Sequence, residues 1–247
     1  MVNLDVLIVS AVAELAATQP DPEPDLKLDL KLDHKLDHKL DSELDSELDS
    51  IKLMNTATDR FPMPEIASLP EDLRLKILDV QQKAGFVPNV FLKLARRPDE
   101  CRAFFAYHDA LMLRENNLSK AEKEMIVVAT SGLNQCLYCV VAHGAILRIY
   151  AKNPRLADQL ATNYRKAEIT TRQQAMLAFA LKVAADSSSL NDADFNALKE
   201  YGFTDDDAWD IGAIAAFFAL SNRMANLSGM MPNEEFYLMG RLPRPAK

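Results

Sequence analysis

Beyond residue 65 the chain is a succession of segments in which apolar residues recur at the three- and four-residue spacing of an α-helix. No segment shows the sustained alternation of apolar and polar residues that a half-buried strand needs, and no βαβ pattern occurs. The pattern therefore predicts an all-α fold. Helices are expected over 70–85, 88–96, 98–113, from Ser119 to a break at 132–134, and over 136–150, 154–166, 171–185, 192–201 and 205–227.

Several helix ends are marked by residues that favour capping. Ser119 and Glu122 have the spacing of a capping box ahead of an apolar run, and Thr204 suits the N-cap of the last helix. Asn134 is expected to interrupt the helical pattern and to be the N-cap of the helix that begins at Cys136. Gly202 is expected to close the helix over 192–201.

The last predicted helix is apolar over most of its circumference. Its large apolar residues are Ile211, Ile214, Phe217, Phe218 and Leu220. One small domain is not expected to cover all of them, so the pattern favours a homo-oligomer.

The first 50 residues follow a different pattern. From residue 25 to residue 50 a tetrapeptide repeats, with a leucine at every fourth position from Leu28 to Leu48. On a helix a period of four drifts by about 40° per repeat, so the leucines would wind around it and form no single burial face. We therefore expect an acidic, disordered tail over 1–50, a linker over 51–64 and a helical domain over 65–247. A helical arm that packs on a neighbouring subunit is the alternative, and His34 with His38 could bind a metal.

The charge distribution argues against several functions. Residues 1–50 carry 13 acidic residues and 4 lysines, a net charge of −9, whereas residues 51–247 carry 23 acidic and 24 basic residues. A nearly neutral body without a basic patch predicts no nucleic-acid partner. No apolar run reaches membrane-spanning length, and the apolar N-terminal stretch contains Asp5 and has no Lys or Arg before it. We therefore expect no membrane partner, no secretory signal and a cytoplasmic location.

The residues that indicate chemistry lie between Glu124 and His143. Cys136, Cys139 and His143 are spaced i, i+3 and i+7, which would place them on one helix face. Cys136 is expected in the first turn, where free N–H groups and the helix dipole favour a thiolate, and sulfurs one turn apart can form a disulfide. Glu124 lies on the preceding, antiparallel helix and could orient His143, which could take the proton of Cys139. A nucleophile, a base and a group that orients the base are the parts of an activated thiol.

Other interpretations of these four residues stay open. The cysteines could be buried core residues, with His143 and Glu124 as ordinary polar groups. The four side chains could also hold a structural zinc ion, although such sites commonly draw on two separated ligand pairs and the chain has no second CxxC. Three cysteines are too few for a disulfide framework. The third, Cys101, has no base at helical spacing before His108, and we expect it to be inert.

The run LSKAEKEMIVVATSGLNQCLYCVVAH, residues 118–143, resembles the core motif of the AhpD-like alkylhydroperoxidases, which belong with the carboxymuconolactone decarboxylases. That motif has a glutamate twelve residues before the first cysteine of a C-x-x-C-x-x-x-H pattern, and Glu124, Cys136, Cys139 and His143 match it. The runs GFVPNV (85–90) and AFFALSNRMANLSG (216–229) resemble the peroxidase-related branch, so the similarity covers about residues 65–235. Tyr138 is a departure, because some members have a second histidine there.

The resemblance implies an AhpD-like helical bundle that reduces alkyl hydroperoxides through a disulfide cycle in which Cys139 attacks and Cys136 resolves. It implies no bound cofactor or metal, an external dithiol or thioredoxin-like reductant, and a dimer, trimer or hexamer. A dithiol oxidoreductase or redox adaptor that does not handle peroxide is the alternative. A decarboxylase-type lyase is a second, weaker alternative, because the decarboxylase members of the family lack the cysteine pair.

Overall fold

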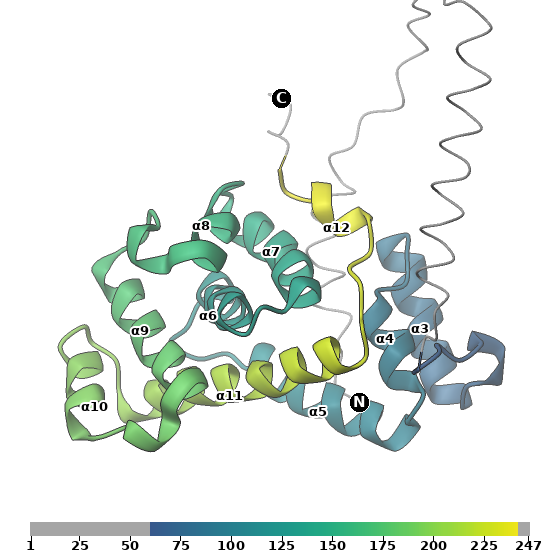
Figure 1. The fold of residues 1–247 in the computed structure, drawn as a ribbon, viewed down its shortest axis with the longest axis horizontal. Coiled ribbons are helices and arrows are strands. Elements are labelled where there is room, and N and C mark those ends of the chain that lie inside the picture. Colours follow the sequence, from purple (N-terminus) through teal and green to yellow (C-terminus); the bar gives the residue numbers. More distant parts are fainter. Residues whose placement is uncertain (1–59, 242–247) are drawn as a thin grey trace, which may run out of the picture. The chain divides into compact units, whose positions relative to one another are not determined.

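The computed structural model describes residues 60–241, which contain helices and no strand. Residues 63–241 belong to one compact unit, whose elements are arranged as Figure 1 shows. In chain order they are η1 (Ile66–Ser68), α3 (Glu71–Ala84), α4 (Asn89–Ala95), α5 (Pro98–Met112), α6 (Lys120–Leu133), α7 (Leu137–Ala151), α8 (Leu156–Asn163), η2 (Tyr164–Lys166), α9 (Thr171–Asp186), η3 (Ser187–Ser189), α10 (Asp192–Lys199), α11 (Asp205–Leu227) and α12 (Glu235–Leu238). The all-α prediction is confirmed.

The predicted helix ends agree with the structure where a side chain or a glycine sets them. The side chains of Ser119 and Thr204 accept the N3 N–H in complete capping boxes, and Gly85 closes α3 with φ of 82°. One predicted cap is wrong. Asn134 is the C-cap of α6, and the N-cap of α7 is Cys136 itself. Gly202 closes the helix that was predicted over 192–201: it has φ of 79°, and the N–H groups of Gly202 and Phe203 donate to the carbonyls of Lys199 and Leu198. The short helix α12 was not predicted.

Helix α6 lies at the centre of the bundle and packs against α7, α8, α9 and α11 (Figure 1). Every residue from Glu122 to Ser131 is buried. A helix enclosed on all sides gains no stability from a polar face, so it is apolar around its whole circumference except at a few positions. The polar side chains on α6 are therefore the informative ones, and Glu124 is fully buried among them.

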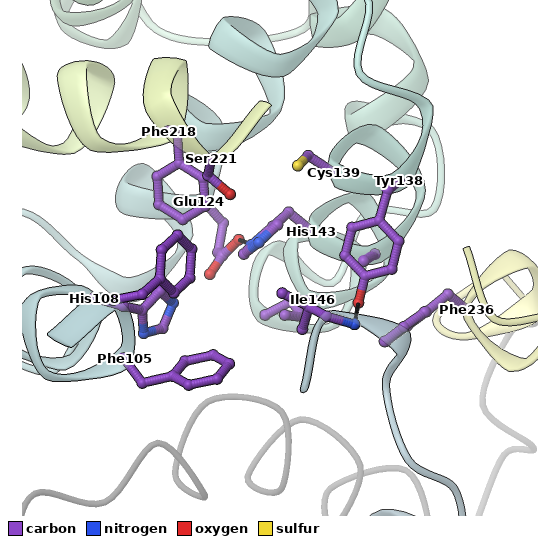
Figure 2. Close-up of a pocket in the computed structure, with 13 residues that line it drawn as sticks. Phe105, His108, Glu124, Tyr138, Cys139, His143, Ile146, Phe218, Ser221 and Phe236 are labelled. Atoms are coloured by element: carbon purple, nitrogen blue, oxygen red, sulfur yellow. Dashed lines mark hydrogen bonds and ion pairs between the residues drawn. The ribbon is translucent and has the colours of Figure 1, made fainter. Parts of the chain in front are cut away.

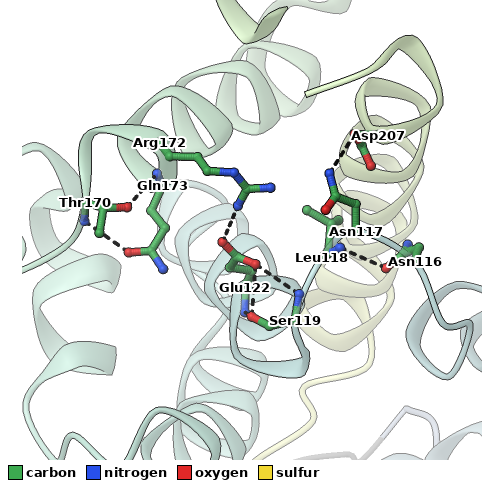
Figure 3. Close-up of polar contacts among 9 residues, drawn as sticks. All are labelled: Asn116, Asn117, Leu118, Ser119, Glu122, Thr170, Arg172, Gln173 and Asp207. Carbon is green, nitrogen blue, oxygen red and sulfur yellow. Dashed lines mark hydrogen bonds and ion pairs between the residues drawn. The ribbon is translucent and has the colours of Figure 1, made fainter. Parts of the chain in front are cut away.

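A polar network fixes the first turn of α6 against its neighbours (Figure 3). Glu122 completes the cap by accepting from the backbone N–H of Ser119, and it also accepts a hydrogen bond from Arg172 of α9 across 2.6 Å. The guanidinium of Arg172 lies 3.9 Å from the centre of the Phe203 ring. Asn117 donates to Asp207 of α11 at 3.1 Å. The start of α6 is thus held from two sides, which sets the rotation of the helix and the position of Glu124.

The chain itself buries more of the large apolar residues of α11 than the sequence pattern predicts. Ile211, Ile214, Phe217 and Phe218 are all buried within the chain, and only Leu220 of the predicted set is exposed. The buried four therefore give no reason for self-association. The large apolar residues that α11 does leave exposed are Trp209, Leu220, Met224 and Leu227. The homo-oligomer stays a prediction.

Some predictions fall outside the described residues. These are the tail over 1–50, His34 and His38, and the linker as far as residue 59. Within residues 60–241, no helix has both the length and the apolar character to cross a membrane.

Candidate active site

The turn between α6 and α7 places the two motif cysteines in different settings. Gln135 adopts a left-handed conformation with φ of 51°, and Cys136 then has the extended backbone of an N-cap. Its Sγ accepts a hydrogen bond from the backbone N–H of Cys139 at 3.4 Å. Cys136 is therefore the N-cap residue, one position before the first turn in which the sequence placed it, which corrects that part of the prediction. A thiol at an N-cap satisfies one of the free N–H groups of the helix end.

Cys139 and His143 line a pocket that is otherwise mostly apolar (Figure 2). The helix α7 contributes both residues, and α4, α5, α6, α11 and α12 supply the remaining walls. The lining residues are Val90, Phe104, Phe105, His108, Glu124, Tyr138, Cys139, Ala142, His143, Ile146, Phe218, Ser221 and Phe236. The structure thus brings together three of the four predicted site residues in one pocket, and Cys136 stands behind Cys139.

The predicted contact between Glu124 and His143 is present. The Nδ1 atom of His143 lies 2.9 Å from Oε2 of Glu124, whose side chain is fully buried. Because a carboxylate only accepts hydrogen bonds, Nδ1 carries the hydrogen and Nε2 is left as an acceptor. The ring of Phe218 packs edge-on against the imidazole, with 4.8 Å between the ring centres. This contact and the carboxylate together fix the orientation of His143.

The electrostatics of the cysteine pair favour the first negative charge on Cys136. A hydrogen bond from the thiol of Cys139, assisted by the N–H of Cys139 and by Asn222, lowers the pKa of Cys136 to about 7. The same bond to Cys136, together with burial, raises the pKa of Cys139 well above its ordinary value. The helix start, which the sequence predicts to favour a thiolate at Cys136, and the hydrogen bonds of the pair act in the same direction. The N-cap position decides which sulfur ionises first.

Two polar residues of α11 reach the cysteine pair and were not identified as site residues from the sequence. Asn222 is fully buried, donates to Ser131 Oγ at 2.9 Å and accepts from Asn134 at 3.0 Å. Its side chain also lowers the pKa of both thiols by hydrogen bonding, and Ser221 does the same for Cys139. The only signal in the sequence was a Ser-Asn pair within an otherwise apolar run.

Helix α5 supplies a second imidazole to the pocket. His108 lies on the opposite side of Glu124 from His143 (Figure 2), and its Nδ1 is 3.1 Å from Oδ1 of the buried Asp109. Burial lowers the pKa of His108, so the ring is neutral at physiological pH. From the sequence His108 was considered only as a base too distant to activate Cys101, and its contact with the pocket was missed.

Tyr138 does not replace a histidine in acid–base chemistry. Its hydroxyl accepts a hydrogen bond from the backbone N–H of Val90 at 3.3 Å, and burial raises its pKa above the ordinary value. The phenol instead ties the CxxC turn to the start of α4.

The third cysteine is not among the residues that line the pocket. Cys101 is buried in another apolar cluster, where desolvation raises its pKa to about 11. Over residues 60–241, no group of three or more His, Cys, Asp or Glu side chains is placed to bind a metal ion.

Comparisons with known proteins agree with this geometry. The carboxymuconolactone decarboxylase family profile matches residues 98–155. A crystal structure of an alkylhydroperoxidase AhpD core, a peroxidase-related protein from Ralstonia eutropha JMP134, is 71% identical with a TM-score of 0.73 and covers 74% of this chain and 97% of that one. A peroxidase-related protein from Silicibacter sp. TM1040 is 41% identical with a TM-score of 0.69, over 73% and 94% of the two chains.

A more distant structure is similar in fold alone. The apo debrominase Bmp8 is 20% identical with a TM-score of 0.61, over 73% of this chain and 95% of that one. No curated protein sequence matches this chain significantly.

Proposed function

This chain belongs to the AhpD-like alkylhydroperoxidase family, within the carboxymuconolactone decarboxylases, and from that premise we propose that it is a thiol peroxidase that reduces organic hydroperoxides. The observation that carries the proposal is the shared pocket of Cys139, His143 and Glu124. A thiol, a base and the carboxylate that orients the base meet there among apolar side chains suited to an organic group.

The first step oxidises Cys139. His143 takes the thiol proton at Nε2, because its Nδ1 hydrogen is held by Glu124. The thiolate then attacks the terminal oxygen of the hydroperoxide, so that an S–O bond forms while the O–O bond breaks. Overall, one thiol and one hydroperoxide give a sulfenic acid and an alcohol, and two electrons pass from sulfur to oxygen.

The second step forms the disulfide. In the reduced pair the pKa of Cys136 is lowered to about 7, and the backbone N–H of Cys139, which is one cause of that shift, still donates to the Cys136 sulfur after Cys139 is oxidised. The Cys136 thiolate attacks the sulfur of the Cys139 sulfenic acid, hydroxide leaves, and a proton converts the hydroxide to water. Cys136 is suited to this role because it adjoins Cys139 and does not line the pocket. Cys139 is the sulfur that the substrate meets, although it is the less acidic of the two.

The cycle requires an external electron source. The disulfide takes up two electrons each turn, and a dithiol or a thioredoxin-like protein would supply them by thiol–disulfide exchange. No bound cofactor takes part in these steps. The homo-oligomer and the cytoplasmic location remain predictions alongside this scheme.

Stopped-flow oxidation of the fully reduced chain tests the function. Cumene hydroperoxide should oxidise the wild type much faster than it oxidises free cysteine, and peptide mapping should find a Cys136–Cys139 bridge. The Cys101→Ser variant is the matched control and should react like the wild type. Oxidation no faster than that of free cysteine would favour the dithiol oxidoreductase or adaptor, and a main bridge that contains Cys101 would refute the assignment.

Metal analysis tests the zinc alternative separately. The peroxidase proposal predicts that the purified wild type contains no stoichiometric zinc and that a chelator leaves thiol alkylation unchanged. A structural zinc ion would instead be lost in Cys139→Ser and His143→Gln, and the wild-type thiols would become reactive only after chelation.

A further inference from the structure

The Glu124–His143 pair accepts the proton of the thiol, and the leaving oxygen of the hydroperoxide also needs a proton donor close to it. When a thiolate attacks the terminal oxygen of an alkyl hydroperoxide, the other oxygen departs as a strongly basic alkoxide unless it is protonated as the O–O bond breaks. The proton on the attacked oxygen is the nearest one. A group that accepts this proton and returns it to the leaving oxygen would lower the barrier of the step.

His108 has the properties of such a group. It lines the same pocket as Cys139 but comes from α5, on the far side of Glu124 from His143 (Figure 2). The Nδ1 hydrogen is held by the carboxylate of Asp109 at 3.1 Å, so Nε2 is a free acceptor. The rings of Phe217 and Phe218 lie 6.0 and 6.1 Å from the imidazole, centre to centre. An imidazole oriented by a buried carboxylate accepts a proton and gives it back readily.

The polar groups of the pocket also indicate where a hydroperoxyl group would lie. The Oε1 atom of Glu124 is buried, and no residue of the described chain donates a hydrogen bond to it. Figure 2 places the Glu124 carboxylate between the rings of His143 and His108. The lining residues include no lysine or arginine. This end of the pocket therefore offers acceptors to the O–H of a neutral peroxide, and the phenylalanine rings are left for its organic group.

We propose that His108, oriented by Asp109, carries the proton of the bound hydroperoxide from the attacked oxygen to the leaving oxygen, an inference that rests on the proposed peroxidase function. The Cys139 thiolate forms the S–O bond as the O–O bond breaks, and Nε2 of His108 takes the proton from the attacked oxygen. The imidazolium then protonates the other oxygen, so the products are a sulfenate and an alcohol. His143 returns the thiol proton to the sulfenate, and both imidazoles end neutral.

Two classes of oxidant distinguish this role from a structural one. An alkyl hydroperoxide such as tert-butyl hydroperoxide has a poor leaving group and needs the shuttle. A peracid such as peracetic acid leaves as a weakly basic carboxylate and moves its own proton internally to its carbonyl oxygen. Single-turnover oxidation of Cys139 is therefore measured with both oxidants in the full-length wild type, His108→Gln and Asp109→Asn. Tyr107→Phe, an exposed neighbour on the same helix, is the matched control.

We expect His108→Gln to slow the alkyl hydroperoxide reaction by about 10²-fold or more, within the range of general acid–base catalysis, and the peracid reaction by less than about tenfold. Asp109→Asn should show a smaller loss with the same selectivity, and Tyr107→Phe none. An equal loss with both oxidants, or no loss with either, would overturn the proposal. If neither variant folds, the wild type in heavy water decides: the alkyl hydroperoxide reaction should slow more than the peracid reaction, and equal slowing of both would overturn the proposal. A failure of the peroxidase function itself would look different, since the wild type would then react with both oxidants no faster than free cysteine.

Discussion

The backbone N–H of Cys139 donates a hydrogen bond to the Sγ of Cys136 across 3.4 Å, which makes a thiol the N-cap of helix α7. The thiol of Cys139 adds a second hydrogen bond in the same direction and lowers the pKa of Cys136 further. One negative charge is therefore held at the helix N-terminus, close behind the sulfur that faces the pocket. A resolving thiol that is already ionised can attack a sulfenic acid as soon as it forms.

Removing the Cys139 thiol should raise the pKa of Cys136. In Cys139→Ala the S–H donor is lost while the backbone N–H remains, so the pKa should rise from about 7 towards the ordinary 9.0. The ultraviolet absorbance of the thiolate, followed against pH, measures this. Cys101→Ser is the control and should leave the titration near pH 7 unchanged. A Cys136 pKa that is the same in wild type and Cys139→Ala would contradict the shared-proton arrangement.

The lowered pKa of Cys136 also makes the free energy of unfolding depend on pH. A thiol that ionises more easily in the folded state stabilises the fold as a thiolate. This contribution should be fully present above the unfolded pKa of 9.0 and lost as the pH falls through about 7. Urea unfolding of wild type and Cys136→Ala at several pH values should show the difference between them growing from pH 7 to pH 9.

Replacing Glu124 by Gln should reduce reactivity with little loss of folding. The change keeps the shape of the side chain but removes the charge that supports protonation of His143. We expect the ionised Cys139 thiol, with His143 protonated, to lose about 1.4–2.7 kcal/mol of stabilisation, which corresponds to an oxidation rate of Cys139 that is about 10- to 100-fold lower. Glu122→Gln, two residues earlier on α6, should instead lower thermal stability and spare the rate, because Glu122 serves the cap and Arg172. Equal rates in wild type and Glu124→Gln would refute the relay.

Asn222 should matter for both stability and thiol acidity. Asn222→Ala leaves the buried Ser131 and the half-buried Asn134 without this partner, and an unpaired buried polar group costs about 1–3 kcal/mol. It also removes a hydrogen bond that lowers the pKa of both thiols, so the Cys136 titration should move to higher pH. Denaturant unfolding and thiolate absorbance measure the two effects. Leu227→Ala, an exposed position on the same helix, is the control for changes on α11.

The close approach of α6 and α8 depends on a glycine. A Cβ at Gly132 would lie 2.9 Å from Cα of Ala161 and closer still to its carbonyl oxygen, so the two backbones would have to separate. We expect Gly132→Ala to destabilise the fold by about 1–3 kcal/mol, as overpacking usually does. Gly144→Ala meets only side-chain atoms, at 3.3 and 3.4 Å, and should cost less. The thermal unfolding of the two variants compares them, and an equal cost would contradict this reason.

Deletion of residues 1–50 should preserve the helical domain and its chemistry. The repeat offers no single burial face, and residues 1–50 carry a net charge of −9, both of which favour solvation. Thermal unfolding, sedimentation and the rate with cumene hydroperoxide are compared in the full-length and shortened chains. A large loss of stability or of an oligomer on truncation would support the helical arm instead.

The helices and the reactive motif could be predicted from local patterns in the amino-acid sequence. Helix type and most ends follow from local spacing and from caps such as Ser119, Thr204 and Gly85, because these interactions join residues within a turn of each other. The pairing of Glu124 with His143 was also predictable, since two consecutive antiparallel helices place their side chains opposite each other.

The set of groups that share the pocket could not be predicted in the same way, because it depends on how the helices pack. Cys136 is the N-cap of α7 and follows the left-handed Gln135, and helical periodicity does not show at which of two neighbouring residues a helix begins. Asn222 reaches Ser131, 91 residues away in sequence, because α11 crosses α6. His108 reaches the pocket because α5 packs on α11. Such contacts depend on how helices far apart in the chain pack together, and local sequence patterns carry no information about that packing.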